Sequence, residues 1–277
     1  MKLYLGTYTK KASKGVYQLE LNQDQLKNLE LLHEVDNPTY IDLEGNTLFS
    51  VVKEGSQGGI AYFKDGLLVN QVVEEGAPPC YVSSISSKSL VFSANYHGGR
   101  INTYALSNGT LVDHQKLSFG EGSKAHYIQY DANLDRVLVC DLGLDRVYAF
   151  RINEENKLVL SATYQADAKT GPRHLVVHPE TKLVYVFTEL SSELHVVDFS
   201  NDDVKLIEKV SALPEGVDAQ KWGAAIRLSN DGRFLYVSNR GHDSISVFKL
   251  GETLELIQNV STEGVQPRDF NLSPCGK

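Results

Sequence analysis

One motif of about 46 residues recurs along the chain, and it restricts the possible folds more than any other feature. Each copy consists of an apolar strand that ends in an acidic or amide residue, a short turn, and a second strand of alternating polarity. We call that acidic or amide residue the anchor. In five copies, 41 to 50 residues apart, the anchors are Glu54, Asn95, Asp141, Glu189 and Asn239, and an earlier copy has Thr7 in this position. A period of this length indicates structural units that pack against one another.

A strand–turn–strand pattern leads to each of the five anchors, as in "WGAAIRLSNDGRFLYVSN" at residues 222–239. The turns are rich in Asn, Asp, Gly and Pro, as short hairpins require, and no long stretch has helical periodicity. Repeats of roughly 40–50 residues with about four strands each are typical of β-propeller blades. The sequence therefore predicts an all-β chain that forms a single β-propeller domain over residues 1–277.

We expect the last blade to be incomplete. The segment "GVQPRDFNLSPCGK" at residues 264–277 resembles "GPRHLVVHPETK" at residues 171–182, so it opens a further blade. Its anchor would fall about 47 residues after Asn239, beyond the last residue of the chain. The expected architecture is about six blades plus the first strand of a seventh, truncated at the C-terminus.

Aligning the copies on their turns predicts which residues occupy equivalent positions around a propeller axis. The first strand of a blade lines the central channel, and the second runs antiparallel to it. The first position of that inner strand holds Thr39, Cys80, His126, Arg173, Ala224 and Arg268, and the next holds Tyr40, Tyr81, Tyr127, His174, Ala225 and Asp269. Because the residue type changes from blade to blade, we predict a pocket that binds one asymmetric ligand at the rim where these residues and the anchors meet.

Several of these residues also have structural interpretations that the sequence leaves open. Asp141 and Asn239 either face the pocket or cap turns by binding backbone N–H groups. Trp222 is either a pocket wall or a core residue. Four residues of extended strand separate His174 from His178 by ~13 Å, so the two histidines cannot share a metal ion, and His178 fits a turn position.

Composition excludes some classes of partner. A net charge of −8 and a pI near 5.5 argue against broad contact with nucleic acid or an acidic membrane, whose protein partners carry a basic stripe. The sequence contains neither a signal peptide nor the roughly 20 apolar residues of a membrane-spanning helix. Cys80, Cys140 and Cys275 are widely spaced and odd in number, which fits reduced thiols. We expect a cytoplasmic protein that binds a small molecule, with neither nucleic acid nor membrane as a partner. The sequence does not predict its oligomeric state.

The repeats resemble the cytoplasmic lactonase family of seven-bladed propellers, which includes propeller-type 6-phosphogluconolactonases and a fungal carboxymuconate lactonizing enzyme. The resemblance covers essentially the whole chain. It rests on "GTYT…SKGVY" at 6–17, "NPTYI" at 37–41, "GAPPCYV" at 76–82, "ANYHGG" at 94–99, "AHYIQYD" at 125–131, "DLGLDRVYAF" at 141–150, "GPRHLVVHP" at 171–179, "TEL" at 188–190, "DGRFLYVSNRGHDSISVF" at 231–248 and "QPRDFNLSPCG" at 266–276. It implies a carboxylic ester hydrolase that opens the lactone ring of 6-phosphogluconolactone in the pentose phosphate pathway.

The resemblance also implies which residues form the active site. They are His126, Arg173, Glu189 and Arg240, with His174, Asp141 and Arg268 nearby, and the anchor Asn95 joins the substrate-binding set. Neither a metal ion nor an organic cofactor is expected. The chain departs from the family at residues 123–126, where Ser-Lys-Ala-His stands in place of the frequent Pro-His-Ala-His. Only His126 of that pair is present, so a catalytic role that needs both histidines does not carry over to this chain.

Lactone hydrolysis needs an activated water and stabilisation of the negative charge that develops on the carbonyl oxygen. Glu189 or His126 could accept the proton of the water, and Arg173 could stabilise the oxyanion. Arg240 or Arg268 could bind a substrate phosphate through paired N–H groups. These roles fit the phosphorylated sugar lactone that the resemblance implies as the substrate.

Three other interpretations remain open. The same fold could act on another sugar lactone or on a muconolactone, as a lactonase or cycloisomerase. It could instead be a propeller without catalytic activity that binds proteins, although the predicted rim is charged and polar rather than apolar. A chain without its last blade strands could also lack activity because the ring does not close.

Overall fold

Strands make up most of the molecule. The computed structural model describes residues 1–22, 25–217 and 220–273, and the one helical segment assigned within them is the short 3-10 turn η1 (Ser86–Lys88). In this described part, no helix is long and apolar enough to cross a bilayer. The all-β prediction is confirmed.

The strands of the first half of the chain are short and follow one another through tight turns. In chain order they are β1 (Lys2–Leu5), β2 (Gly15–Asn22), β3 (Gln25–Glu34), β4 (Ile41–Glu44), β5 (Thr47–Glu54), β6 (Gln57–Lys64), β7 (Leu67–Glu75), β8 (Tyr81–Ile85), β9 (Leu90–Asn95), β10 (Arg100–Ser107), β11 (Thr110–Ser118) and β12 (Ala125–Asp131).

The second half continues the same pattern. Its strands are β13 (Arg136–Asp141), β14 (Arg146–Ile152), β15 (Leu158–Gln165), β16 (Pro172–Val177), β17 (Val184–Thr188), β18 (Glu193–Asp198), β19 (Lys205–Ser211), β20 (Trp222–Leu228), β21 (Phe234–Arg240), β22 (Ser244–Lys249) and β23 (Glu255–Ser261). Residues 262–273, where the sequence predicted the first strand of a further blade, are described without an assigned strand. Residues 274–277, which include Cys275, lie outside the described part.

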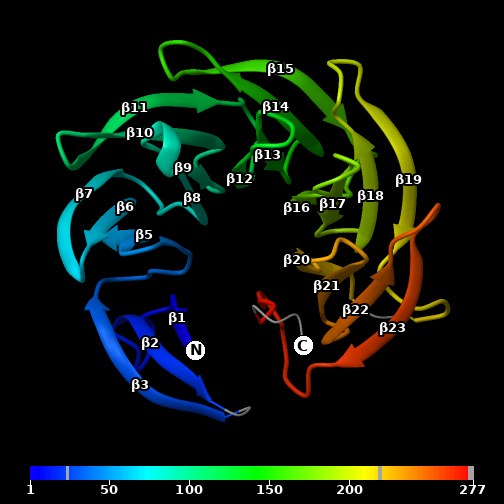
Figure 1. Cartoon of the computed structure of the whole chain (residues 1–277), viewed down its shortest axis with the longest axis horizontal. Coiled ribbons are helices and arrows are strands. Elements are labelled where there is room, and N and C mark those ends of the chain that lie inside the picture. Colours follow the sequence, from blue (N-terminus) through cyan, green and yellow to red (C-terminus); the bar gives the residue numbers. More distant parts are fainter. Residues whose placement is uncertain (23–24, 218–219, 274–277) are drawn as a thin grey trace. The chain divides into compact units, whose positions relative to one another are not determined.

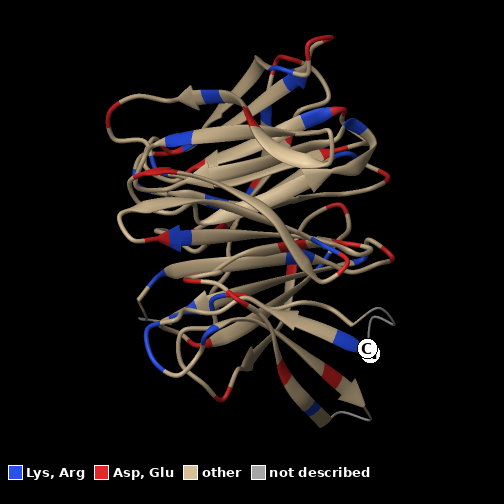
Figure 2. Ribbon diagram, turned by 90° about the vertical axis from the view of Figure 1, so that its left-hand side faces the viewer, with Lys and Arg blue, Asp and Glu red and all other residues tan. Residues whose placement is uncertain are grey.

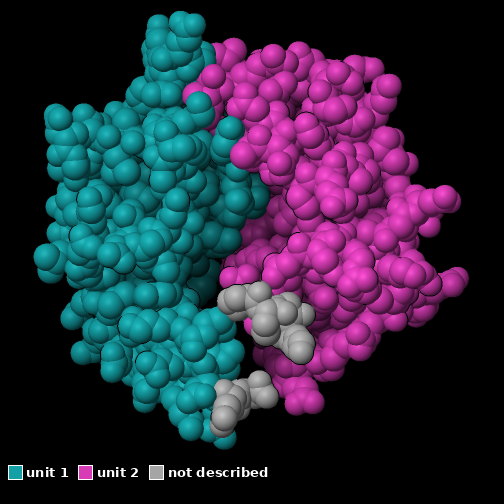
Figure 3. Space-filling view, viewed as in Figure 1, with its two compact units in different colours: residues 1–130, 153–157 teal, residues 131–152, 158–277 magenta. Residues whose placement is uncertain are grey.

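The chain divides into two compact units (Figure 3): unit 1 comprises residues 1–130 and 153–157, and unit 2 comprises residues 131–152 and 158–277. In unit 1, consecutive strands pair antiparallel in the orders β1-β2-β3, β4-β5-β6-β7 and β8-β9-β10-β11 (Figure 1). In unit 2 the orders are β13-β14-β15, β16-β17-β18-β19 and β20-β21-β22-β23. From β4 to β11 and from β16 to β23 the chain thus repeats four strands at a time, as the spacing of the anchors predicts.

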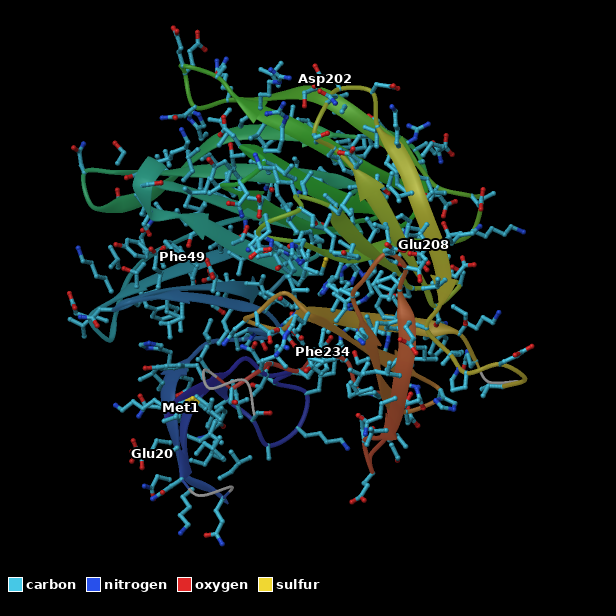
Figure 4. All side chains as sticks on the ribbon, turned by 45° about the vertical axis from the view of Figure 1, so that its right-hand side comes forward. Met1, Glu20, Phe49, Asp202, Glu208 and Phe234 are labelled. Carbon is cyan, nitrogen blue, oxygen red and sulfur yellow. The ribbon has the colours of Figure 1, made fainter. Side chains whose placement is uncertain are left out.

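Within each unit, neighbouring sheets bury apolar faces against each other, because alternate side chains of a strand point to opposite faces. In unit 1 one core cluster contains Phe49 of β5, which is labelled in Figure 4, together with Val82 of β8 and Tyr104 of β10. In unit 2 a core cluster joins Phe187 of β17 to Phe248 of β22. This packing fixes the strand ends, where the polar residues of the repeat lie.

The tyrosines of the second predicted column contact one another in unit 1, with their rings tilted rather than parallel. The ring centroids of Tyr40 and Tyr81 are 4.1 Å apart, and those of Tyr81 and Tyr127 are 4.6 Å apart. The hydroxyls of Tyr81 and Tyr127 both donate to Oε1 of Gln129, at 3.4 and 2.7 Å. The register read from the repeat is therefore confirmed for these three blades, and the tyrosines pack as amphipathic residues.

A buried histidine joins two sheets of unit 2. His195 of β18 is fully buried, and its Nδ1 lies 2.9 Å from the hydroxyl of Tyr164 on β15. Its Nε2 lies 3.6 Å from the carboxylate of Glu193. Burial lowers the pKa of His195, and the charge of Glu193 opposes this, whereas Lys209 adds to it. Burial also raises the pKa of Tyr164 to about 12, so the phenol donates and His195 Nδ1 accepts.

Acidic and basic residues are interspersed along the ribbons on the side drawn in Figure 2. Several of the ion pairs in the described part of the chain join two exposed side chains. Asp202, labelled in Figure 4 in the loop between β18 and β19, accepts from Arg151 of β14 at 2.8 Å, with both side chains more than half exposed. Pairs of this kind contribute little to stability, which sets them apart from the buried pairs described next.

Candidate active site

The ends of strands in two neighbouring sheets of unit 2 bring three charged residues together. Arg173 is the second residue of β16, Glu189 directly follows β17, and Arg240 is the last residue of β21. Oε2 of Glu189 accepts from Nε of Arg173 at 2.9 Å and from Nη2 of Arg240 at 2.8 Å. Arg173 is 2% exposed and Arg240 8%, whereas the Glu189 side chain is 18% exposed. We call these three residues the Glu189 cluster.

A β-bulge turns Arg173 toward Glu189. In the β16–β17 ladder, Pro172 pairs with Thr188 and His174 pairs with Phe187, so Arg173 is the extra residue of the bulge. A bulge re-aims a side chain that regular alternation would place elsewhere. The equivalent part of β20 is also irregular, with a register shift between Gly223 and Ile226.

Arg173 also contacts a backbone carbonyl oxygen and the ring of His174. Its Nη1 donates to the carbonyl oxygen of Ala224 at 2.8 Å and lies 3.2 Å from Nε2 of His174. A guanidinium can only donate, so Nε2 of His174 accepts, and the proton of this neutral ring is on Nδ1. Arg173 and His174 therefore lie together in the site, and Arg173 holds Glu189 and His174 in place from a buried position.

Gly223 allows the two sheets to approach at this point. Its N–H donates to the carbonyl oxygen of Glu189 at 2.9 Å, and its carbonyl oxygen accepts from Nη2 of Arg240 at 3.0 Å. A Cβ at this position would lie 2.2 Å from the carbonyl oxygen of Thr188 and 2.8 Å from the ring of Phe187. Only glycine fits this close approach of backbones.

Trp222 borders the cluster, which settles a question that the sequence left open. It is the first residue of β20 and pairs with Arg240 in the β20–β21 ladder. The guanidinium carbon of Arg240 lies 5.9 Å from the centre of the Trp222 ring system, within the range of a cation–π contact. Trp222 is 36% exposed, so it is not a core residue.

Two aspartates between β13 and β14 bond backbone N–H groups, Asp141 within its own turn and Asp145 in the loop that leads into β16. Asp141 is fully buried at the end of β13, and its Oδ1 accepts from the N–H groups of Gly143 and Leu144, which makes it a turn cap. Asp145 accepts from Lys169 N and Gly171 N, both at 2.8 Å. Sequence reasoning did not assign this role to Asp145. The only signal available was its place in the anchor turn, since the bond partners come from another blade.

The buried thiol of Cys140 lies next to Asp141 in the chain, and its pKa depends on nearby charges. Burial raises the pKa of the Cys140 thiol well above its usual value. The charge of Asp141 acts in the same direction, and that of Arg173 acts against it. The charges of Asp141 and Arg173 therefore act on the same thiol in opposite directions. Oδ1 of Asp141 accepts its hydrogen bonds from the backbone of the turn. The capping alternative for Asp141 is the one that the structure supports.

Arg268 is not brought to the Glu189 cluster. It lies in the irregular segment after β23 and is exposed, and it makes no hydrogen bond or ion pair with a described residue. Its neighbour Asp269 pairs with Arg227 at 2.7 Å, and Phe270 lies beneath the same guanidinium. No strand holds Arg268 in the register that the repeat predicted for it.

His126 and Asn95 belong to unit 1. His126 is buried at the start of β12, with its ring 6.1 Å from that of Tyr96, and the ammonium of Lys124 lies 5.3 Å from the same Tyr96 ring. Cys80 lies 3.5 Å from the carbonyl oxygen of His126, which agrees with their shared column. Asn95 donates to Ala77 O and accepts from Gly98 N, so both ends of its amide are used in a turn.

His178 occupies a turn, as the sequence predicts. Its Nδ1 accepts from the N–H groups of Glu180 and Thr181, and its Nε2 donates to the carbonyl oxygen of Gly232 at 3.0 Å. Both ring nitrogens are therefore engaged in structural bonds. Within the described residues, no group of three or more His, Cys, Asp or Glu side chains has the geometry of a metal site.

Comparisons with known proteins agree on the type of fold. A family model described as "Lactonase, 7-bladed beta-propeller" matches residues 2–277. The 6-phosphogluconolactonase of Bacillus subtilis is 33% identical over 98% of this chain and 84% of its own length. A crystal structure of a Lactobacillus plantarum protein superposes with a TM-score of 0.94 at 38% identity, covering 99% of this chain and 86% of that one. The periplasmic gluconolactonase of Pseudomonas aeruginosa superposes with a TM-score of 0.87 at 25% identity, covering 99% and 86%.

Proposed function

The chain belongs to the family of seven-bladed β-propeller lactonases, and we propose that it hydrolyses 6-phosphogluconolactone to 6-phosphogluconate in the pentose phosphate pathway of the cytoplasm. The observation that carries this proposal is the Glu189 cluster, in which two buried arginines hold one oxygen of a partly exposed carboxylate. The similarity to the Bacillus subtilis 6-phosphogluconolactonase supports the choice of substrate.

In the proposed reaction, water attacks the lactone carbonyl carbon, the ring C–O bond breaks, and the ring oxygen leaves as the new hydroxyl. Oε2 of Glu189 is fixed by Arg173 and Arg240, while Oε1 accepts no hydrogen bond from a described residue. We assign Glu189 Oε1 as the acceptor of the water proton. Proton transfer of this kind contributes about 10²–10⁴-fold to the rate.

The contacts favour different roles for the two arginines. Arg173 is almost fully buried and donates to Glu189 and Ala224, so it acts as a positioning residue rather than as the oxyanion ligand that the sequence suggested. Arg240 has a buried Nε with no hydrogen-bond partner among the described residues. We assign this N–H to the developing oxyanion, because a fixed donor at the reacting carbonyl is a large source of rate acceleration.

Other residues retain the roles predicted for them from the sequence. His126 remains a second proposed proton acceptor, and Arg268 a proposed ligand of the substrate phosphate. His174 accepts from Arg173 through Nε2 and so helps to position it. Asp141 and Asn95 are also predicted from the sequence to bind substrate, but their side chains form hydrogen bonds within turns and have structural roles. The proposed mechanism uses no metal ion or organic cofactor.

The proposal is tested by measuring hydrolysis of freshly generated 6-phosphogluconolactone, after subtraction of the spontaneous rate. We expect Glu189→Gln to lower kcat by about 10²–10⁴-fold while the variant remains folded, because the amide keeps an acceptor for the arginines. Glu180→Gln is the matched control, since Glu180 is an exposed carboxylate in the "HPET" turn that follows β16. No acceleration by the wild-type protein, or equal rates for the two variants, would contradict the proposal.

The second candidate is hydrolysis of a sugar lactone without phosphate. The similarity to the Pseudomonas aeruginosa gluconolactonase favours it. Comparing kcat/KM on gluconolactone and on its 6-phosphate separates the candidates, because a phosphate ligand raises this ratio only for the phosphorylated substrate.

A further inference from the structure

We propose that Trp222 is a substrate-binding residue whose indole face covers the ring of a six-membered sugar lactone. The inference rests on the proposed function and deepens it, since it names the chemical feature that the site recognises: a compact ring with C–H groups on one face and hydroxyls at its edge. Such a ring fits an aromatic wall beside charged groups.

The position of Trp222 points to a ligand. It begins β20, one residue before Gly223, whose backbone bonds both Glu189 and Arg240. Its indole N–H forms no hydrogen bond with a described residue, and 36% of the residue is exposed directly beside side chains that are almost fully buried. A large aromatic residue that packs against a buried side chain and is itself partly exposed to solvent is typical of a binding-site wall.

Arg240 supplies the second, independent observation. More than nine-tenths of this residue is buried, and its Nε has no hydrogen-bond partner among the described residues. Buried polar groups are nearly always bonded, so this N–H is open to an acceptor that a ligand or a water molecule supplies. The same guanidinium lies 5.9 Å from the Trp222 ring, so one bound molecule can contact both residues.

The assignment explains how the site distinguishes ligands. An aromatic face attracts polarised C–H groups through its negative quadrupole, whereas the arginine attracts the oxygens at the edge of the same ring. A muconolactone has a five-membered ring with planar unsaturated or carboxylate substituents and offers fewer axial C–H groups. We therefore expect Trp222 to favour six-membered sugar lactones over such compounds.

Trp222 is the single tryptophan of the chain, so its fluorescence reports directly on the site. The experiment titrates the intact protein with 6-phosphogluconate, the stable product, while recording emission and quenching by acrylamide. We expect a saturable change in emission and reduced quenching at saturation, because the bound sugar covers the exposed indole face. The Trp222→Phe protein provides the fluorescence blank.

Kinetics of two variants complete the test. Trp222→Ala should raise KM by between about twofold and tenfold, the range of a single aromatic contact, with a smaller change in kcat, and Trp222→Phe should recover most of the loss. Tyr8→Ala is the matched control, because Tyr8 is an exposed ring in unit 1 with the Lys10 ammonium 5.3 Å from its centre. Thermal melts establish that each variant is folded.

The outcomes separate this inference from the proposed function. If the protein hydrolyses the lactone, but product leaves the Trp222 emission unchanged and Trp222→Ala has wild-type KM, the inference is wrong and the proposed function stands. If hydrolysis is absent, but 6-phosphogluconate still protects Trp222 from quenching, the function is wrong and the binding role stands. If a folded Trp222→Phe protein is as impaired as Trp222→Ala, a stacking role for the aromatic face is refuted.

Discussion

Replacing Gly223 by alanine tests whether the close approach of β20 to the end of β17 assembles the active site. The new Cβ would lie 2.2 Å from Thr188 O, whereas an ordinary contact begins at 3.4 Å, so the start of β20 must move by about 1.2 Å. That movement would stretch the bonds that Gly223 makes to Glu189 and Arg240 beyond hydrogen-bonding range. Overpacking of this kind costs about 1–3 kcal/mol.

The effect on activity should exceed the effect on stability. A misplacement of about 1 Å costs roughly 10²-fold in rate, whereas a loss of stability of ~1–3 kcal/mol lowers Tm by roughly 2–4 °C per kcal/mol in a chain of this size. The assays are lactone hydrolysis and a thermal melt followed by circular dichroism. Gly251→Ala is the control, because a Cβ there meets only Thr253 O at 3.8 Å. A Gly223→Ala protein with wild-type kcat/KM would refute the claim that this approach positions the Glu189 cluster.

Two further predictions concern stability. Burial lowers the folded-state pKa of His195 below its usual value of 6.5, so the unfolded chain binds the proton more readily; stability from this group is complete above about pH 6.5 and is lost as the pH falls through the lowered folded-state value. Tm measured from pH 8 to pH 5 should therefore decline less steeply for His195→Gln than for the wild type, and parallel curves would contradict this. Tyr81→Ala removes the ring between Tyr40 and Tyr127 and should lower the free energy of unfolding by about 3–5 kcal/mol in urea titrations. A loss below about 1 kcal/mol would mean that the ladder does not stabilise unit 1.

The repeat predicted the strand order and the register because both depend on local patterns. Period-2 polarity and turn residues mark where each strand begins and ends, and the fourfold grouping of strands from β4 onward follows from the anchor spacing. The ring contacts of Tyr40, Tyr81 and Tyr127 are the strongest example, since residues more than 40 positions apart were aligned by sequence and lie in contact. The contacts that the side chains make at the strand ends were harder to predict from the sequence.

Sequence reasoning failed where a role depends on the partner strand. The bulge that turns Arg173 toward Glu189 is a mismatch between two ladders and leaves no mark in either strand alone. Likewise, nothing local distinguishes Gly223 from a turn glycine, because the reason for it is the carbonyl oxygen of Thr188 in another blade. Arg268 shows the converse case: its position in the motif predicts a site residue, but no assigned strand holds it in that register, so its role as a phosphate ligand stays a prediction.

The charge of the Glu189 cluster is opposite in sign to that of the whole chain and suits the anionic substrate that we propose. The chain carries a net charge of −8, yet two arginines against one carboxylate give the cluster a formal charge of +1, and His174 is neutral because Nε2 accepts from Arg173. Exposed acidic groups are screened over about 8 Å at physiological ionic strength, whereas charges in a buried cluster are screened much less. A phosphorylated lactone near the cluster therefore experiences mainly the local positive charge. In the proposed reaction the same charge stabilises the oxyanion on the carbonyl, so substrate attraction and rate acceleration share one physical origin in the arginine whose Nε has no partner within the described chain.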